Sequence, residues 1–201
     1  MKKIVMSWAV VIGILAGISA SANATLVTFD LTGNGRSLGN TYTFSQDGFD
    51  MTARAQEEVD SGWINRRSVY QTRYGLGVKG RREHGYQDSG QVDGWGRDEA
   101  LMFSFDSSVS LETANFGSLR FRDDFNLAVY NNGWLTVQED SRKVCYSCYT
   151  GTAFRFWADS YEDDFFVKQL KFDIPTAVPE PATLALLCLG VLAVGVSRRT
   201  S

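Results

Sequence analysis

The chain has 201 residues, 44% of them hydrophobic and 21% charged, and its formal net charge is −3. This length suits one domain with a substantial hydrophobic core. Because the charge is negative, the composition argues against a protein whose main partner is nucleic acid.

The first 24 residues have the features of a secretory signal peptide. Lys2 and Lys3 give a positive start, residues 4–20 are apolar apart from small residues, and Ala22-Asn23-Ala24 is a small-x-small cleavage site. We expect cleavage after Ala24, and an uncleaved anchor is the alternative. The body that follows, residues 25–177, holds 16 Lys/Arg and 22 Asp/Glu, a net charge of −6.

Alternating apolar and polar residues predict β-strands throughout this body. Leu101, Phe103 and Phe105 form an apolar face of period two, as do the apolar residues of 125–129. Only residues 53–59 resemble a helical turn. We therefore expect an all-β fold, a single antiparallel β-sandwich of jelly-roll type.

Turn residues predict two hairpins and a bulge. Asp47-Gly48 separates residues 42–44 from an alternating run that begins at Phe49, and Asn131-Asn132-Gly133 precedes residues 134–137. The apolar period changes phase at Lys168-Gln169, which predicts a β-bulge there.

Residues 61–82 contain six Lys/Arg and no acidic residue. Trp63, Tyr70 and Tyr74 lie among these cations and could stack on sugar rings or bases, while Arg81 and its basic neighbours could meet an anionic polysaccharide. Alternatively, strand alternation places the aromatic rings in the core and the arginines in solvent.

Residues 74–97 are rich in glycine, which is typical of a functional or mobile loop. Trp95 is the better candidate for stacking on a ligand, because a large aromatic residue in a loop has less reason to lie in the core. We expect Trp95, Asp93 and Arg81 to contact a ligand. Four carboxylates in and after the loop could offer oxygen ligands to Ca²⁺: Asp88, Asp93, Asp98 and Glu99. Alternatively, the Asp side chains cap turns through their own backbone.

Two acidic segments repeat one pattern, aromatic-x-Asp-Asp-Phe, at residues 121–125 and 161–165. They could be equivalent strand entrances or a pair of calcium-binding turns.

Cys145 and Cys148 could form a small disulfide loop in an exported chain or remain free thiols. The lone His84 has no evident nucleophile beside it and no Gly-x-Ser-x-Gly is present, so we expect no enzyme.

The C-terminal segment begins with Val178-Pro179-Glu180-Pro181 and ends with Arg198-Arg199. Between them, residues 182–196 carry no charge and span about 22 Å as a helix, short of the roughly 30 Å of a bilayer core. The arginines favour the cytoplasmic side of the inner membrane, which places the body outside. A plain C-terminal anchor would also fit these features.

This order of Pro-Glu-Pro, short transmembrane helix and arginines resembles the PEP-CTERM sorting signal of Gram-negative bacteria. The resemblance implies a signal at residues 178–201 that an exosortase processes, with only transient attachment to the inner membrane. It also implies a cell-surface or secreted protein in an organism that makes exopolysaccharide. Residues 75–78, 92–93 and 98–105 resemble a pattern of PEP-CTERM bodies, although Gly94 stands where that pattern often has Asn.

Two functions from different classes follow from the resemblance. The first is a non-enzymatic surface or matrix protein that associates with exopolysaccharide, through carbohydrate binding. The second is a small secreted hydrolase of that polysaccharide, because carboxylate pairs of suitable separation are invisible in a sequence.

Overall fold

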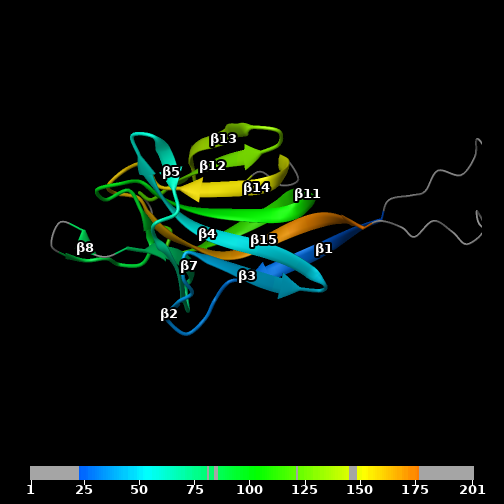
Figure 1. Ribbon diagram of the computed structural model, residues 1–201, viewed down its shortest axis with the longest axis horizontal. Helices are drawn as coiled ribbons and strands as arrows, with labels where there is room; N and C mark the ends of the chain where they lie inside the picture. The colour runs from blue at the N-terminus through cyan, green and yellow to red at the C-terminus, as the bar shows by residue number, and fades with distance from the viewer. Residues whose placement is uncertain (1–22, 81, 84–85, 121, 145–148, 177–201) are drawn as a thin grey trace, which may run out of the picture. The chain divides into compact units, whose positions relative to one another are not determined.

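Fifteen β-strands form the secondary structure of the residues that this computed structural model describes, which are 23–80, 82–83, 86–120, 122–144 and 149–176 (Figure 1). Thirteen strands join in one large sheet, and β8 and β9 form a separate pair. The pairs that β11 forms with β4, β14 and β15, and that β12 forms with β14, are antiparallel. The all-β, antiparallel prediction is therefore confirmed, and the finer jelly-roll sandwich stays a prediction. The bounds are β1 Asn23–Asp30, β2 Arg36–Ser37, β3 Thr41–Gln46, β4 Phe49–Val59, β5 Gly62–Ile64, β6 Ser68–Thr72, β7 Gly75–Lys79, β8 Arg82–Glu83, β9 Tyr86–Gln87, β10 Val92–Asp93, β11 Glu99–Gly117, β12 Phe125–Tyr130, β13 Trp134–Ser141, β14 Tyr149–Trp157 and β15 Asp164–Thr176.

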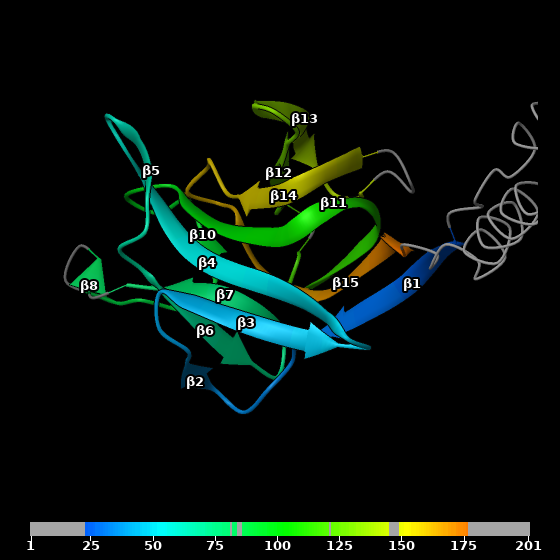
Figure 2. The same cartoon turned by 45° about the vertical axis from the view of Figure 1, so that its right-hand side comes forward.

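The long strand β11 is the centre of the sheet. Its first part pairs with β4 and β14, and its last part pairs with β15, with a register shift between Ser104 and Val109. This lets the sheet bend, and Figure 2 shows the curved course of β4, β11 and β15. The buried face is rich in phenylalanine: Phe116 stacks on Phe125 at 4.4 Å and meets Phe156 edge-on at 5.7 Å.

Both predicted hairpins are confirmed. In the β3–β4 hairpin, Gln46 pairs with Phe49 across Asp47 and Gly48, whose φ angles are 53° and 81°. These two positive φ angles are what a two-residue hairpin turn requires, and Asp-Gly supplies them at low cost. In the β12–β13 hairpin, Asn132 has a φ of 60°.

The predicted bulge is also confirmed. Asn115 pairs with Gln169 but the next residue, Phe116, pairs with Val167, so Lys168 is the extra residue of β15. Residues 53–59, which resemble a helical turn in sequence, form part of strand β4, because Met51, Ala53 and Ala55 bury one face of that strand.

The residues from Thr25 to Ile174 make up one compact unit. In the part of the chain that the structure describes, no helix combines the length and hydrophobicity needed to cross a membrane. The expected signal peptide, residues 1–24, lies almost wholly outside the described residues. The expected sorting segment, residues 178–201 with its helix at 182–196, lies entirely outside them.

Candidate functional site

Tryptophan and arginine side chains share the face of the sheet that points away from the phenylalanine core. Arg155 in β14 is the cross-strand partner of Met102 and Ala128, whereas its neighbour Phe156 is buried opposite Leu101. Residues paired across antiparallel strands project to the same face. On this face Trp157 pairs with Ala100 and Asn126, Trp134 with Tyr130, and Trp63 with Glu58. We call the group Trp63, Tyr130, Trp134, Arg155 and Trp157 the aromatic face.

Arg155 organises the rings of the aromatic face. Its guanidinium carbon lies 4.0 Å from the centre of the Trp134 ring and 5.0 Å from that of Trp63. Trp63 in turn lies edge-on to Trp157 at 6.2 Å. Each cation–ring contact is electrostatically attractive and gains strength where water is excluded. The guanidinium therefore fixes two tryptophans that come from β5 and β13.

A chain of amides holds Arg155 in place. Its Nε donates a hydrogen bond of 2.9 Å to Gln56 Oε1, and Gln56 Nε2 donates one of 2.9 Å to Asn65 Oδ1. Burial lowers the pKa of Arg155 to about 10, although the negative charge of Glu58 acts to raise it. The guanidinium is thus protonated at neutral pH, and its terminal amino groups form no hydrogen bond with the residues that the structure describes.

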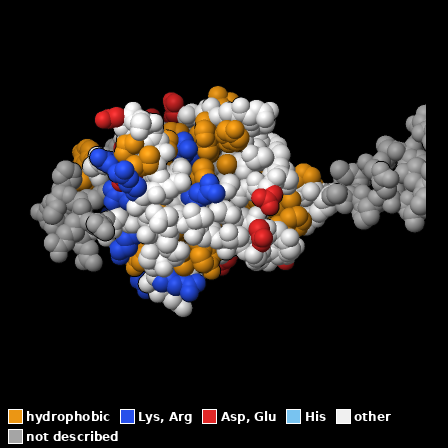
Figure 3. All heavy atoms as spheres, viewed as in Figure 1, with side chains coloured by type: hydrophobic (Ala, Val, Ile, Leu, Met, Phe, Trp, Pro, Cys, Tyr) orange, Lys and Arg blue, Asp and Glu red, His pale blue; other side chains and the backbone are white. Residues whose placement is uncertain are grey.

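The aromatic face is open to solvent. Trp134 is 40% exposed and Tyr130 39%, while Trp63 and Trp157 are half-buried. Figure 3 shows hydrophobic side chains gathered over β5 and over β12–β14, with basic side chains between them. Flat rings of this kind pack against apolar surfaces, and a guanidinium donates to hydroxyl or carboxylate oxygens. The combination suits a sugar ring, which has an apolar C–H face and a polar rim.

The basic segment 61–82 is divided between two places. Trp63 belongs to the aromatic face, whereas Tyr70 and Tyr74 line a cavity of about 710 Å³ together with Arg73 and Arg120. None of these three aromatic side chains is buried, so the alternative that placed them in the core is wrong.

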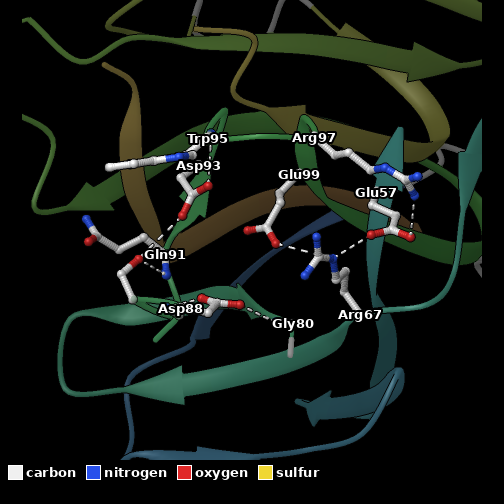
Figure 4. A network of polar contacts seen from close by, with 11 residues as sticks. Glu57, Arg67, Gly80, Asp88, Gln91, Asp93, Trp95, Arg97 and Glu99 are labelled. Atoms are coloured by element: carbon white, nitrogen blue, oxygen red, sulfur yellow. Dashed lines mark hydrogen bonds and ion pairs between the residues drawn. The ribbon is translucent and has the colours of Figure 1, made fainter. Parts of the chain in front are cut away.

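Figure 4 shows the acidic residues of the glycine-rich segment engaged in turns. Asp88 accepts hydrogen bonds from the backbone N–H groups of Gly80 and Gly90, the latter at 2.6 Å. Asp93 accepts one from the N–H of Trp95 at 3.1 Å. The Asp side chains therefore cap turns, as the alternative to calcium binding had it. Trp95 is 54% exposed.

The other two expected calcium ligands point elsewhere. Glu99 is fully buried and faces Arg67, whose Nε lies 3.6 Å from Glu99 Oε1 and 2.7 Å from Glu57 Oε2 (Figure 4). Asp98 lies beside Glu58 at a cavity of about 440 Å³. The structure thus does not gather Asp88, Asp93, Asp98 and Glu99 into one group. The reason is local: turn amides and Arg67 already engage three of the four carboxylates.

The raised pKa of Asp98 makes the stability of the fold depend on pH. Burial, then the hydrogen bond with Glu58 and its charge, then the charge of Asp159, raise the pKa of Asp98 from 3.8 to about 6. Ionised Asp98 therefore destabilises the fold, so stability from this group is lost as the pH rises from about 4 to about 6. We expect Asp98→Asn to raise the free energy of unfolding at pH 7 by about 1 kcal/mol, since the half-buried group is partly screened by water.

This expectation is checked by urea unfolding of both proteins at several pH values, without added divalent cations. The gain from Asp98→Asn should shrink to nearly nothing at about pH 3.5, where the wild-type carboxyl is mostly protonated. A gain of equal size at both ends of the range would contradict the assigned cause.

The two repeated acidic segments meet in space. The N–H of Asp124 donates to Asp163 Oδ1 at 3.1 Å, and one carboxylate oxygen each of Asp124, Asp159 and Asp163 lies within 4.8 Å of the others. Among the described residues, these form the one group of three carboxylates close enough to share an ion. The repeated pattern pointed to two of them, and Asp159 was missed because it belongs to no motif.

Sequence reasoning also missed most of the aromatic face. The available signal was that Trp157 stands out of phase with the buried Phe154 and Phe156, which leaves it on the solvent side. Strand β13, which carries Trp134, has no buried residue that would set such a phase. Several expected site residues lie outside the described residues: Arg81, Cys145, Cys148, Val178, Pro179, Glu180, Pro181, Arg198 and Arg199.

Comparison with known proteins identifies the C-terminal segment. A family model described as the PEP-CTERM protein-sorting motif matches residues 177–199, while no curated protein and no solved structure matches the chain. The expected sorting signal is thereby confirmed. The motif implies a protein that is exported, processed by an exosortase and sorted to the cell surface. This chain carries a PEP-CTERM protein-sorting motif at residues 177–199.

Proposed function

We propose that the protein is a non-enzymatic component of the cell surface or extracellular matrix that binds exopolysaccharide through its aromatic face. The observation that carries this proposal is the arrangement of Trp63, Arg155 and Trp134, in which one fixed guanidinium holds two partly exposed rings on an open sheet face. Open faces suit long polymers, because a chain can extend beyond the site on both sides.

The geometry supports sugar binding in two complementary ways. The rings offer flat apolar surface, which a hexose covers with its C–H face, and burying such surface is favourable at about 25 cal/mol per Å². The buried arginine offers N–H donors that are already oriented by Gln56, so little side-chain entropy is lost on binding. A carboxylated sugar would gain most, because it can accept two hydrogen bonds from a guanidinium.

The proposal is tested by mixing the purified exported protein with matrix polysaccharide from its own cells. We expect retention of the protein on the polysaccharide and no release of new reducing ends. Retention that persists on cellulose, dextran and the matrix polysaccharide alike would show adhesion without specificity and would contradict the proposal. The absence of retention on all three would do the same.

A hydrolase of the same polysaccharide is the second candidate, and the pair Asp98–Glu58 favours it. A carboxyl of raised pKa beside a second carboxylate in a cavity is a pattern of acid–base sites. However, the two side chains are joined by a hydrogen bond, whereas glycosidases hold their carboxyl groups about 5 Å or more apart. New reducing ends that disappear in Asp98→Asn would establish the hydrolase.

The sorting step has its own expected result. In cells without the exosortase, we expect the protein to keep residues 178–201 and to remain with the inner membrane, because the apolar segment is no longer removed. Mass measurement of the protein from both strains checks this, and an exported protein without the motif serves as control. Identical masses and fractionation in the two strains would refute exosortase processing.

A further inference from the structure

Three strands begin or end at one acidic cluster. Asp124 directly precedes β12, Asp163 precedes β15, and Asp159 lies in the turn that follows β14. One carboxylate oxygen of each lies within 4.8 Å of the other two. Three negative charges at this distance repel one another, so the cluster needs a reason to persist.

Asp163 supplies an independent observation. Asp163 is only 2% exposed. Its Oδ1 accepts a hydrogen bond from the N–H of Asp124, whereas its Oδ2 is buried and has no hydrogen-bond partner among the described residues. A buried carboxylate oxygen without a partner is costly. Burial raises the pKa of Asp163 to about 6, and the charges of Asp124 and Asp159 act in the same direction, whereas the backbone N–H groups of Asp124 and Ser160 act to lower it.

The neighbouring groups are already engaged in other ways. Asp123 accepts the N–H of Arg120, and Asp164 accepts Gln91 Nε2 at 2.7 Å. Arg122 reaches Glu162 at 4.0 Å. The charge of Arg142 lowers the pKa of Asp124, but burial and the charges of Asp140 and Asp159 outweigh it, so that pKa is raised.

The turn that carries Asp159 is held from its other side by the glycine-rich segment. Gly94 packs so closely on the backbone of Ser160 that a Cβ at this position would collide with the Ser160 carbonyl oxygen. The N–H of Asp163 donates to that same carbonyl at 3.0 Å. The backbone thus places Asp159 and Asp163 beside Asp124 by packing that any larger residue at 94 would disturb.

We propose that Asp124, Asp159 and Asp163 bind one Ca²⁺ ion, which fastens together the ends of β12, β14 and β15. Ca²⁺ takes six to eight oxygen ligands in flexible geometry, and exposed Asp159 leaves room for water to complete the set. Mg²⁺ fits less well because it demands near-octahedral geometry and loses its water reluctantly. An exported protein meets Ca²⁺ at the concentrations that extracellular sites of moderate affinity use.

The test uses the full chain, purified after export, freed of metal with a chelator and titrated with CaCl₂. We expect one binding event per chain and, at about 10 mM Ca²⁺, a rise of roughly 3–10 °C in the melting temperature. An equal rise in MgCl₂, or in NaCl of the same ionic strength, overturns the calcium assignment.

Three variants localise the ion. Asp159→Asn changes an exposed side chain, so it should fold normally and lose at least tenfold in Ca²⁺ affinity. Asp163→Asn should melt higher than wild type without calcium, since it removes the buried charge, and should gain nothing from calcium. Asp106→Asn, an exposed carboxylate in β11, is the matched control and should respond as wild type does.

The proposal is overturned if Asp159→Asn and Asp163→Asn keep the full calcium response, or if wild type shows none. Its failure is separate from that of polysaccharide binding, because the acidic cluster and the aromatic face share no residue.

Discussion

Replacing Arg67 by methionine should lower the free energy of unfolding by about 3–5 kcal/mol, because it removes the cation that two buried carboxylates face. Glu99 is fully buried and Glu57 is 6% exposed, and Arg67 Nε lies within 3.6 Å of one oxygen of each. Methionine keeps most of the side-chain volume but removes the charge. Urea unfolding at pH 7 measures the loss.

Two further variants separate lost charge from lost packing. Adding Glu99→Gln to Arg67→Met should recover part of the stability, since one buried negative charge is gone. Arg97 also lies 3.4 Å from Glu57, but its side chain is 55% exposed. Changing Arg97 to methionine should therefore lower the free energy of unfolding by less than about 1 kcal/mol. Equal losses at positions 67 and 97 would show that burial does not set the value of these pairs.

Replacing Trp134 by alanine should weaken binding to the matrix polysaccharide at least tenfold, or about 1.4 kcal/mol. Trp134 offers the most exposed indole of the aromatic face and is held by Arg155, so its removal takes away stacking surface and frees the guanidinium. For comparison, nucleobases that stack on aromatic side chains contribute about 1–3 kcal/mol each. Affinity electrophoresis or calorimetry with the purified polysaccharide measures the change.

The control variants test the place of binding. Tyr161→Ala removes a ring that is 74% exposed outside the aromatic face, and it should leave the affinity unchanged. Trp95→Ala examines the ligand site expected in the glycine-rich loop. Loss of binding in Trp95→Ala together with normal binding in Trp134→Ala would move the site to that loop.

Local chemistry explains why some of the fold was predictable. Asp47-Gly48 and Asn132 prefer the positive φ angles that hairpin turns need, and this preference acts over two or three residues. The bulge at Lys168 was equally visible, because one extra residue shifts the apolar period of a single strand.

Contacts between distant residues explain what the sequence did not show. Arg155 alternates with the buried Phe154 and Phe156, a local pattern that places its side chain on the solvent side of the strand. Its burial depends on Trp63 and Gln56, which stand more than 90 residues earlier. Likewise, Asp159 gains significance only where β12 and β15 bring Asp124 and Asp163 beside it. Pairings of this range depend on the topology of the sheet, which no local pattern encodes.

The pairing of β1 with β15 joins the first described strand to the last (Figure 1). In a polypeptide that is exported N-terminus first, β1 crosses the membrane early and β15 crosses it late. The hydrogen bond of 3.0 Å from the N–H of Leu31 to the carbonyl of Lys168 therefore cannot form until almost the entire chain has crossed. Closing so long a loop is entropically costly and slow, so β1 emerges as an unpaired edge that is prone to aggregation.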